Sequence, residues 1–400
     1  MLGAVAIALA LAVPQGLRQH VGEDFHVFWQ AGRNFLTGAP LYHGYLPGAR
    51  PLKYPPFAAL VFTPLGLFSL QVAGVLASLL NLGLWVAAVA LTRDILARTF
   101  PERNPSPVPL VLAVVLTAQF FLDNFHHIQV NGLIFVLVLI GIREYLRQRD
   151  WGAAAAIVAA TAIKITPVFF AAWLVIRGRR RTVLAVTVVA IACVLLPLLI
   201  RGPSAGAAEL VEYYHSFLEG HQHGEIDEYS AGQNLAGLVN RMTRPGSDAV
   251  RNSFRYLPAS EHVAQRAYQI LWVTVLLLFL TRLATLRLRG APVSAFELTM
   301  VFLTALLLSP ITFTTHLVPL LFAFATALSV RPATLRGPGR VVAGVLVLGM
   351  AASGLSGRDL AGGAAYQAAG GYSIHAWTML FLLLTAAAVA ARPPSERQSG

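Results

Sequence analysis

The feature that most constrains this chain is a succession of apolar segments long enough to cross a lipid bilayer. A helix of roughly 18 or more apolar residues spans the hydrocarbon core. Hydrophobic residues make up 56% of the chain and charged residues 12%, which excludes an ordinary soluble globule. The sequence therefore predicts an all-α integral membrane protein. Its spans are expected near residues 1–17, 70–92, 107–122, 131–146, 182–200, 268–286, 292–308, 316–330, 341–357 and 373–391.

Residues 152–176 need a different arrangement, because arginine-rich segments flank them on both sides. Short basic loops stay in the cytoplasm, so a single crossing cannot connect two of them. Pro167 cannot donate a backbone hydrogen bond and interrupts a helix. We therefore expect a broken helix pair, interrupted at Lys164-Ile165-Thr166-Pro167, that dips into the membrane and returns. With this pair the chain has about 10–12 membrane segments.

The distribution of charge sets the expected orientation and excludes one class of partner. A net charge of +12 is compatible with nucleic-acid binding, but the arginines cluster in short loops, as membrane topology requires. We therefore expect no nucleic-acid partner, and a polar, chemically equipped side facing away from the cytoplasm. The one cysteine, Cys193, excludes a disulfide framework and a cysteine-based metal site.

The domain organisation follows from these spans. We expect one polytopic membrane domain over residues 1–391 and a polar cytoplasmic tail at 392–400. Within the domain, residues 18–69 form a first outer loop and residues 201–267 a long outer loop. We interpret the first apolar segment as a retained helix, and a cleaved signal peptide is the alternative.

The first outer loop combines a carboxylate with a dense set of aromatic residues. It contains Asp24-Phe25-His26 near its start and Lys53-Tyr54-Pro55-Pro56 further on. Aromatic residues at this density are typical of the headgroup level of a bilayer. A carboxylate beside apolar neighbours at that level suits general-base catalysis. The alternative is a solvated acid that caps an interfacial helix.

A polar segment from Asp123 to Asn131 follows an expected span. Polar groups near the hydrocarbon boundary are costly without partners, so Gln129 and Asn131 are candidates to line a cavity. Mutual hydrogen bonding that stabilises a helix turn is the alternative. The adjacent His126 and His127 point apart on a helix, which disfavours a metal site.

Lys164 lies where the predicted helix pair breaks. Only two of the 30 basic residues are lysines, Lys53 and Lys164. A cation where two half-helices meet is a suitable seat for a phosphate, particularly if backbone N–H groups of a helix N-terminus face it. The alternative is a lysine that extends its ammonium group to the interface.

Two later segments carry further candidates. In the long outer loop, His215, His221, His223, Glu225, Asp227 and Glu228 match no defined metal-ligand spacing, so we expect an acceptor-side loop. Gln233-Asn234 suits a sugar-binding turn or a helix cap. Ser309-Pro310 breaks a helix before His316, which is a candidate substrate contact or a structural histidine.

Together these motifs resemble the polyprenol-phosphate-dependent glycosyltransferases of family 87. Their order and predicted sidedness are more specific than any single motif. The sequence departs from the family pattern at Thr315, where the resemblance implies a histidine or a polar aromatic residue. The residues that carry the resemblance are Asp24-Phe25, Gly38, Tyr42, Tyr54-Pro55-Pro56, Gln129-Val130-Asn131, Lys164-Ile165-Thr166-Pro167, Gln233-Asn234, Ser309-Pro310 and His316.

The resemblance implies a fold and a reaction. The fold is a GT-C-type multi-pass helical bundle in a bacterial cell membrane, with a catalytic cavity on the outer face. The reaction moves mannose or a related pentose, with inversion, from a polyprenyl-phosphate donor to a lipid or glycan acceptor. No metal and no other cofactor is implied. A transporter or flippase of lipid-linked sugars is the alternative. Asp24 would be the catalytic base, and the donor would contact Lys164, Tyr54, Gln129, Asn131, Gln233, Asn234 and His316.

Overall fold

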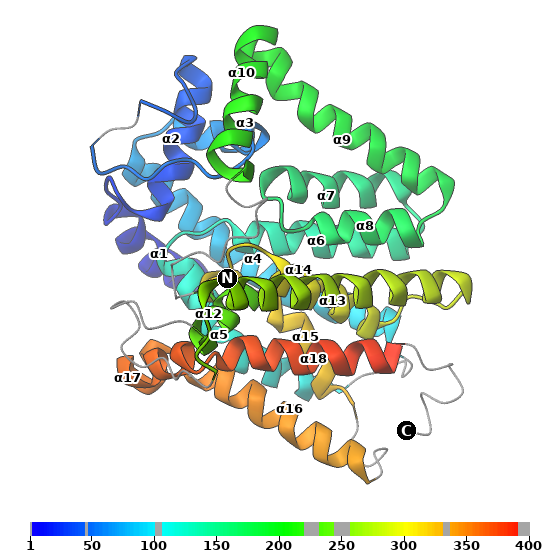
Figure 1. The fold of residues 1–400 in the computed structure, drawn as a ribbon. Coiled ribbons are helices and arrows are strands. Elements are labelled where there is room, and N and C mark those ends of the chain that lie inside the picture. Colours follow the sequence, from blue (N-terminus) through cyan, green and yellow to red (C-terminus); the bar gives the residue numbers. More distant parts are fainter. Residues whose placement is uncertain are drawn as a thin grey trace. The chain divides into compact units, whose positions relative to one another are not determined.

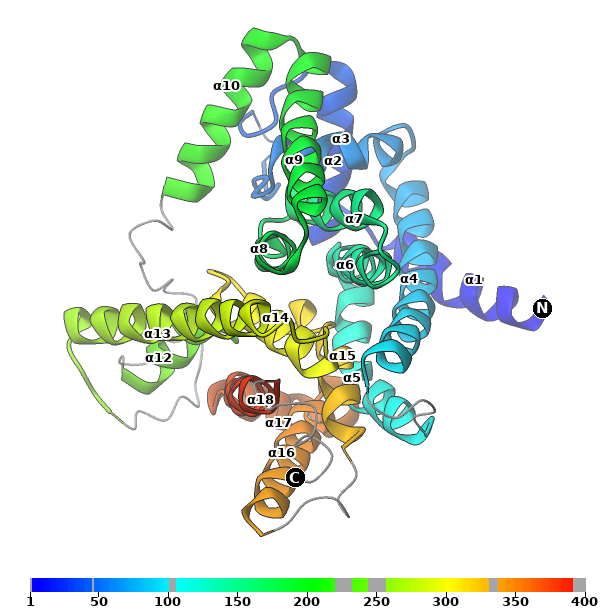
Figure 2. The ribbon, with the colours of Figure 1, turned by 90° about the vertical axis from the view of Figure 1, so that its right-hand side faces the viewer.

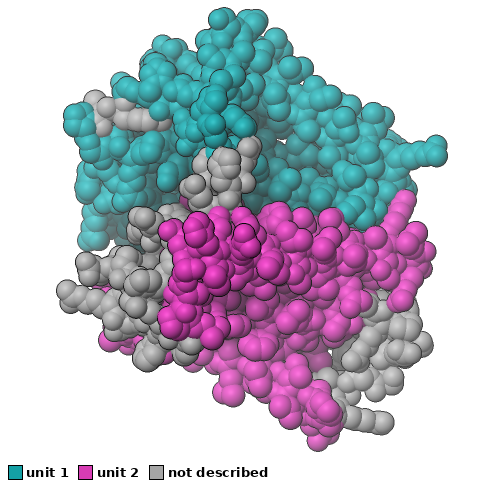
Figure 3. All heavy atoms as spheres, in the orientation of Figure 1, with its two compact units in different colours: residues 1–91, 122–223 teal, residues 92–121, 224–400 magenta. Residues whose placement is uncertain are grey.

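The computed structural model describes residues 2–44, 47–100, 106–219, 232–243, 257–330 and 337–390, and helices joined by turns and irregular segments make up this part of the chain (Figures 1 and 2). No strand occurs in these ranges. The predicted class, an all-α multi-pass membrane protein, is confirmed. The chain forms two compact units, one from residues 1–91 and 122–223 and the other from residues 92–121 and 224–400 (Figure 3).

The first unit contains the N-terminal helices and the predicted broken pair. In it, α7 packs against α6, α8 and α9. Helices α4 (Leu70–Thr99) and α5 (Val108–His126) contain the boundaries between the units. The other helices of this unit are α1 (Leu2–Leu17), α2 (Asp24–Thr37), α3 (Pro56–Gly66), α6 (Asn131–Leu146), α7 (Asp150–Ile163), α8 (Val168–Arg177), α9 (Arg180–Arg201), α10 (Pro203–Tyr213) and a π-helical turn (Tyr214–Leu218).

The second unit is built around α14 and α18, which pack against each other. Helix α18 also contacts α13, α16 and α17. The helices of this unit are α12 (Leu235–Thr243), α13 (Glu261–Leu288), α14 (Ala295–Leu308), a 3-10 turn (Thr314–His316), α15 (Leu320–Leu328), α16 (Pro338–Leu355), α17 (Arg358–Gly371) and α18 (Ile374–Ala390).

Among the described residues, fewer helices are long enough to span a bilayer than the sequence predicts, which is about 10–12. Five qualify by length and composition, namely α4, α5, α9, α13 and α16, and the bent pair α17–α18 gives a sixth if it is one span. The spans expected at 131–146, 292–308 and 316–330 are helices of 16, 14 and 9 residues. The last is short because a 3-10 turn precedes it and Pro319 occupies its N-cap, so α15 begins only at Leu320.

The helix pair around Lys164 is interrupted at the residues that the sequence indicates. Helix α7 ends at Ile163, and Lys164 has an extended backbone. Pro167 occupies the N-cap position of α8, where the absence of a backbone N–H is tolerated.

The two arginine-rich flanks of this pair meet at its other end. The hydroxyl of Tyr145, in α6, donates to the carbonyl of Arg177, the last residue of α8, at 2.9 Å. Asp150, the first residue of α7, accepts hydrogen bonds from Thr182 at 2.6 Å and from Arg179 at 3.0 Å. If the chain enters the membrane along α7 and returns along α8, the start of α7 and the end of α8 must lie close together, as these hydrogen bonds show. The re-entrant placement in the membrane stays a prediction.

Two helices occupy much of the predicted first outer loop. Helices α2 and α3 lie side by side (Figures 1 and 2). Their backbones approach closely because glycine faces the partner helix at two points: a Cβ on Gly32 would lie 2.2 Å from the Phe62 carbonyl oxygen, and one on Gly66 would lie 2.5 Å from the Arg33 nitrogen. The small residues allow this packing. It brings α2, which begins at Asp24, close to Tyr54: the ring centre of Phe28 in α2 lies 5.1 Å from that of Tyr54.

The re-entrant arrangement predicts which side of the membrane each end of the pair faces. In a Cys193→Ser background, cysteines at Arg149 and Arg180 should react with an impermeant thiol reagent only from the cytoplasmic side. A cysteine at Thr166 should react only from the opposite side. The background variant without added cysteine is the control, and labelling of Thr166→Cys from the cytoplasmic side would contradict the arrangement.

Candidate functional site

The carboxylate of Asp24 bonds to side chains from two distant segments. Its Oδ2 accepts a hydrogen bond from Nε2 of Gln129, 105 residues further along the chain, at 2.7 Å. Its Oδ1 accepts from the guanidinium of Arg50. Asp24 is the first residue of α2, where the helix dipole favours a negative charge, and 22% of its side chain is exposed. The carboxylate is thus fixed in position and remains accessible.

Lys164 lies between α7 and α8, in neither helix. Its Nζ donates to Oδ1 of Asn131 at 2.8 Å and lies 5.8 Å from the centre of the Tyr54 ring. Burial lowers the pKa of Lys164 to about 7, against the opposing effect of the Asp24 charge. An anion bound here would favour the protonated form, so this ammonium group is suited to respond to a phosphate.

Tyr54 precedes α3 and lies near both charged groups. Its backbone carbonyl accepts a hydrogen bond from the hydroxyl of Tyr42 at 2.7 Å. Burial raises the pKa of the Tyr54 phenol, and the negative charge of Asp24 raises it further. The phenol therefore stays protonated at neutral pH and can donate a hydrogen bond.

One turn holds both charged groups. Gln129 lies in the turn between α5 and α6, and Asn131, two residues on, is the first residue of α6; they bind Asp24 and Lys164 respectively. The predicted polar segment thus contributes directly to the charged cluster. Since both partners come from a single short turn, the separation of carboxylate and ammonium is set by local backbone geometry.

Hydrogen bonds within the polar segment hold this turn. Ile128 adopts a left-handed conformation with φ of 44°, which is strained for a β-branched residue. The backbone N–H of Gln129 donates to the carbonyl of Asn124 at 2.9 Å. The Asn124 amide donates in return to the carbonyl of Gln129 at 3.3 Å and to Oδ1 of Asn81 at 2.8 Å. The mutual hydrogen bonding that the sequence left as an alternative is therefore present, and it supports the contacts to Asp24 and Lys164.

The structure brings together five of the predicted site residues in the first unit: Asp24, Tyr54, Gln129, Asn131 and Lys164. Sequence reasoning missed Arg50. It is one of many arginines in the chain, and the only signal was its place four residues before Tyr54 on the same loop.

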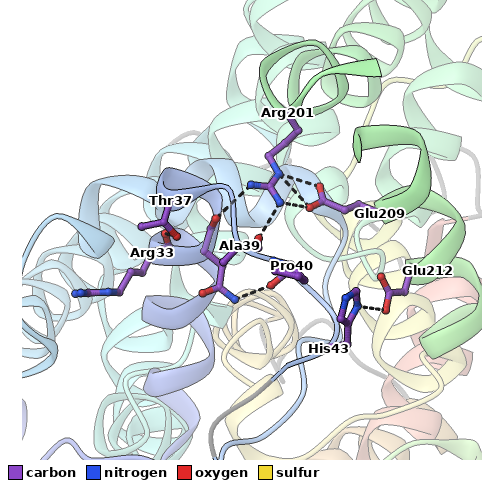
Figure 4. A network of polar contacts seen from close by, with 9 residues as sticks. Arg33, Thr37, Ala39, Pro40, His43, Arg201, Glu209 and Glu212 are labelled. Atoms are coloured by element: carbon purple, nitrogen blue, oxygen red, sulfur yellow. Dashed lines mark hydrogen bonds and ion pairs between the residues drawn. The ribbon is translucent and has the colours of Figure 1, made fainter. Parts of the chain in front are cut away.

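A buried ion pair fixes the end of α2 (Figure 4). The guanidinium of Arg201 bonds to the carboxylate of Glu209, with Nε 3.0 Å from Oε1, and the two side chains are 7% and 8% exposed. It also donates to the carbonyl of Asn34 at 3.3 Å and to that of Ala39 at 2.8 Å. Arg201 thereby satisfies carbonyl groups that a helix C-terminus leaves without partners.

The segment after α2 is held by further contacts. Gly38 ends the helix in a left-handed conformation with φ of 76°. The Asn34 amide donates to the carbonyl of Pro40 at 2.7 Å, and Nδ1 of His43 lies 2.6 Å from Oε1 of Glu212 in α10 (Figure 4). This connection between α2, the following segment and the α9–α10 junction supports the helix that carries Asp24.

In the second unit, Asn234 acts as a helix cap. Its Oδ1 accepts from the backbone N–H of Gly237 at 2.9 Å, at the start of α12. Its amide donates to the carbonyls of Ser309 at 2.6 Å and Pro310 at 2.8 Å. Of the two roles that the sequence allows for Asn234, a sugar-binding turn or a helix cap, these contacts favour the cap. Gln233 is buried beside it, with its backbone N–H donating to the carbonyl of Thr312.

His316 ends the 3-10 turn that follows the break at Pro310. Its Nδ1 accepts from the backbone N–H of Phe313 at 2.8 Å, so the neutral ring carries its proton on Nε2. Thr315, where the sequence departs from the family pattern, is buried. The single pocket expected to unite this histidine with Asp24 and Lys164 stays a prediction.

Most of the histidine and acidic candidates of the predicted acceptor-side loop lie outside the described residues. His215 is described and pairs with Glu219 at 2.8 Å. Among the residues that the structure describes, no three or more histidine, cysteine or acidic side chains group as they would around a metal ion. The members of the loop outside the described residues are His221, His223, Glu225, Asp227 and Glu228.

Comparisons with known proteins give matches to one family. The sequence model of glycosyltransferase family 87 matches residues 52–310. A polyprenol-phosphate-mannose-dependent alpha-(1-2)-phosphatidylinositol mannoside mannosyltransferase of Mycolicibacterium smegmatis is 28% identical over 235 residues, 55% of this chain and 52% of that protein. The protein of the same name from Mycobacterium tuberculosis is 26% identical over 227 residues, 54% of this chain and 51% of its own length.

A third relative differs in its named acceptor. It is a polyprenol-phosphate-mannose-dependent alpha-(1-2)-phosphatidylinositol pentamannoside mannosyltransferase of Mycobacterium tuberculosis, 26% identical over 234 residues, 56% of this chain and 51% of that protein. The chain spans about half the length of the curated relatives it matches. No solved structure matches it significantly.

The buried pair at the end of α2 predicts a large effect on stability. Arg201→Met leaves the buried Glu209 carboxylate and two backbone carbonyls without their donor, which should lower the free energy of unfolding by about 3–5 kcal/mol. Thermal unfolding in detergent measures the change. Arg33→Met is the matched control, because Arg33 is exposed and points away from this network (Figure 4). Equal stability of the two variants would contradict a structural role for Arg201.

Proposed function

Because this chain belongs to glycosyltransferase family 87, we propose that it transfers mannose from a polyprenyl-phosphate donor to a hydroxyl group of a lipid- or glycan-linked acceptor. The transfer inverts the anomeric carbon and takes place on the extracytoplasmic face of the cell membrane. Three relatives named as polyprenol-phosphate-mannose-dependent mannosyltransferases support the donor. Their names support a glycolipid acceptor of the phosphatidylinositol mannoside type.

One observation carries the proposal: a single turn binds a carboxylate and an ammonium group through side chains two residues apart. Displacement of a phosphate by a hydroxyl group needs a base near the hydroxyl and a cation near the phosphate. Asp24 and Lys164 provide these two charges, and Gln129 and Asn131 hold them. Positioning of this kind lowers the entropic cost of the reaction.

In the proposed reaction, the acceptor oxygen attacks the anomeric carbon while Asp24 takes its proton. The bond between the anomeric carbon and the phosphate oxygen breaks, and its electron pair stays on the phosphate. Lys164 and the Tyr54 phenol stabilise the charge that develops there. A phosphate monoester is a stable leaving group, so the site needs no strong general acid.

Residues of the second unit are proposed to contact the donor from the 3-10 turn and from the α12 cap. Because Phe313 fixes its tautomer, His316 presents an Nε2–H donor suited to a phosphate or sugar oxygen. Gln233 and Asn234 remain candidates to bind the sugar, although the side-chain amide of Asn234 already donates hydrogen bonds to the carbonyls of Ser309 and Pro310. A transporter or flippase is the weaker alternative, since the relatives are named as transferases.

Removal of the proposed base should abolish transfer without unfolding the protein. Asp24→Asn keeps the size of the side chain and should lower turnover of polyprenyl-phosphate mannose by about 10²–10⁴-fold. Donor binding should persist. Glu23→Gln is the matched control, since it removes the neighbouring acid, which pairs with His20. Near-wild-type turnover in Asp24→Asn would exclude Asp24 as the base.

The proposed phosphate role of Lys164 predicts a pH dependence of donor binding. With a pKa of about 7, Lys164 is charged below pH 7 and loses its charge as the pH rises. Donor affinity should therefore fall above pH 7, by at most about tenfold per pH unit. The donor is a phosphodiester and does not titrate in this range.

Two variants separate this effect from other titrating groups. Lys164→Ala should bind the donor weakly and without the fall above pH 7, whereas Lys164→Arg should keep its charge and bind at higher pH. Binding is measured without acceptor between pH 6 and pH 9, so the test does not depend on turnover. An unchanged donor affinity in Lys164→Ala would refute the phosphate role.

A further inference from the structure

Arg50 is an exposed arginine whose guanidinium bonds to the carboxylate of Asp24. Its side chain is 59% exposed, and it lies on the irregular segment between Gly48, with a left-handed φ of 80°, and α3. In the described part of the chain, Asp24 is the acid with which Arg50 pairs. The sequence did not single out this residue, and the reaction described above leaves it without a role.

Two arginine–carboxylate pairs of this unit, Arg201–Glu209 and Arg50–Asp24, differ in burial, and therefore in what they can do. Arg201 and Glu209 are 7% and 8% exposed, and Arg201 also binds two backbone carbonyls. Such a pair is part of the fold. Arg50 and Asp24 are 59% and 22% exposed. An exposed pair is weak and its partners can exchange at little cost.

The charges around Asp24 indicate which kind of ligand Arg50 could bind in place of Asp24. Asp24 carries one negative charge, while Arg50 and protonated Lys164 carry two positive charges, and both cations interact with Asp24. The cluster therefore has a net charge of +1. A polyprenyl-phosphate sugar is a phosphodiester with one negative charge, so the occupied site is neutral.

The same balance holds after the reaction. Asp24 gains the acceptor proton and becomes neutral, and the phosphate becomes a monoester with close to two negative charges. Two cations are then needed to match it, and Lys164 supplies only one. A guanidinium suits this task because its planar fork binds two phosphate oxygens at once.

We propose that Arg50 binds the phosphate of the lipid-linked donor, and that in the free protein it is held by Asp24. Arrival of the phosphate draws the guanidinium away from Oδ1 of Asp24. The oxygen that Arg50 occupied is then open to the acceptor hydroxyl, so donor binding prepares the base. This role rests on the proposed function for the identity of the ligand, but it is a property of binding and not of turnover.

The test is a binding series with polyprenyl phosphate and the full chain in nanodiscs of phosphatidylcholine. Arg50→Ala should weaken binding about tenfold or more, because it removes a charge-assisted contact. Arg50→Lys should restore part of the loss. Asp24→Asn should bind about two- to fivefold more tightly than wild type, because it removes the competing carboxylate. The double variant Arg50→Ala/Asp24→Asn should bind as weakly as Arg50→Ala.

Lys53→Ala is the matched control. It removes a positive charge three residues away on the same segment, from an exposed side chain, and should bind like wild type. Polyprenol without phosphate should not distinguish wild type from Arg50→Ala, whereas inorganic phosphate should compete and do so less well in that variant.

Two results would overturn the proposal. If Arg50→Ala binds polyprenyl phosphate as well as Lys53→Ala does, Arg50 does not bind phosphate. If Asp24→Asn binds no more tightly than wild type, Asp24 does not hold Arg50 against the ligand. A merely structural Arg50 would not produce the gain in Asp24→Asn. Failure of the proposed reaction is distinct, because it appears as absence of transfer while this binding series is unaffected.

Discussion

Chain segments in a bilayer have to find partners inside the protein for their polar groups wherever a helix ends, and this constraint accounts for the contact of Lys164 with Asn131 in the candidate site. At the break between α7 and α8, Lys164 has an extended backbone, and its ammonium group donates a hydrogen bond to the side chain of Asn131. The end of α2 leaves carbonyl groups that Arg201 satisfies. These polar contacts of the first unit therefore lie at helix ends.

The turn between α5 and α6 shows how such a contact becomes functional. Asn124 holds the turn from within, and the strained conformation of Ile128 is maintained by these hydrogen bonds. The turn then presents Gln129 to a carboxylate and Asn131 to an ammonium group. The carboxylate and the ammonium group that we propose to act on opposite sides of one sugar are thus held by the same few residues.

Burial distinguishes the pair of Arg201 and Glu209 from the pair of Arg50 and Asp24. The pair of Arg201 and Glu209 is shielded from water, and Arg201 also binds two backbone carbonyls, so loss of one partner leaves the other as a buried charge without a counterion. The pair of Arg50 and Asp24 is exposed, and each partner can turn to another group. The same chemistry therefore stabilises the fold in one place and leaves a ligand-dependent exchange open in the other.

The sequence by itself determined the apolar helical segments and the break between Lys164 and Pro167, because hydropathy and proline act over a few residues, but not the helices α2 and α3 within the expected outer loop. It also identified Asp24, Gln129, Asn131 and Lys164 as candidates, since polar residues at apolar helix ends are uncommon. It could not choose between a sugar-binding turn and a cap at Asn234, nor single out Arg50 among so many arginines. Only the tertiary structure showed the cap contact of Asn234 and the pairing of Arg50 with Asp24, because a contact across 105 residues, such as that of Asp24 with Gln129, depends on how helices pack and not on local pattern.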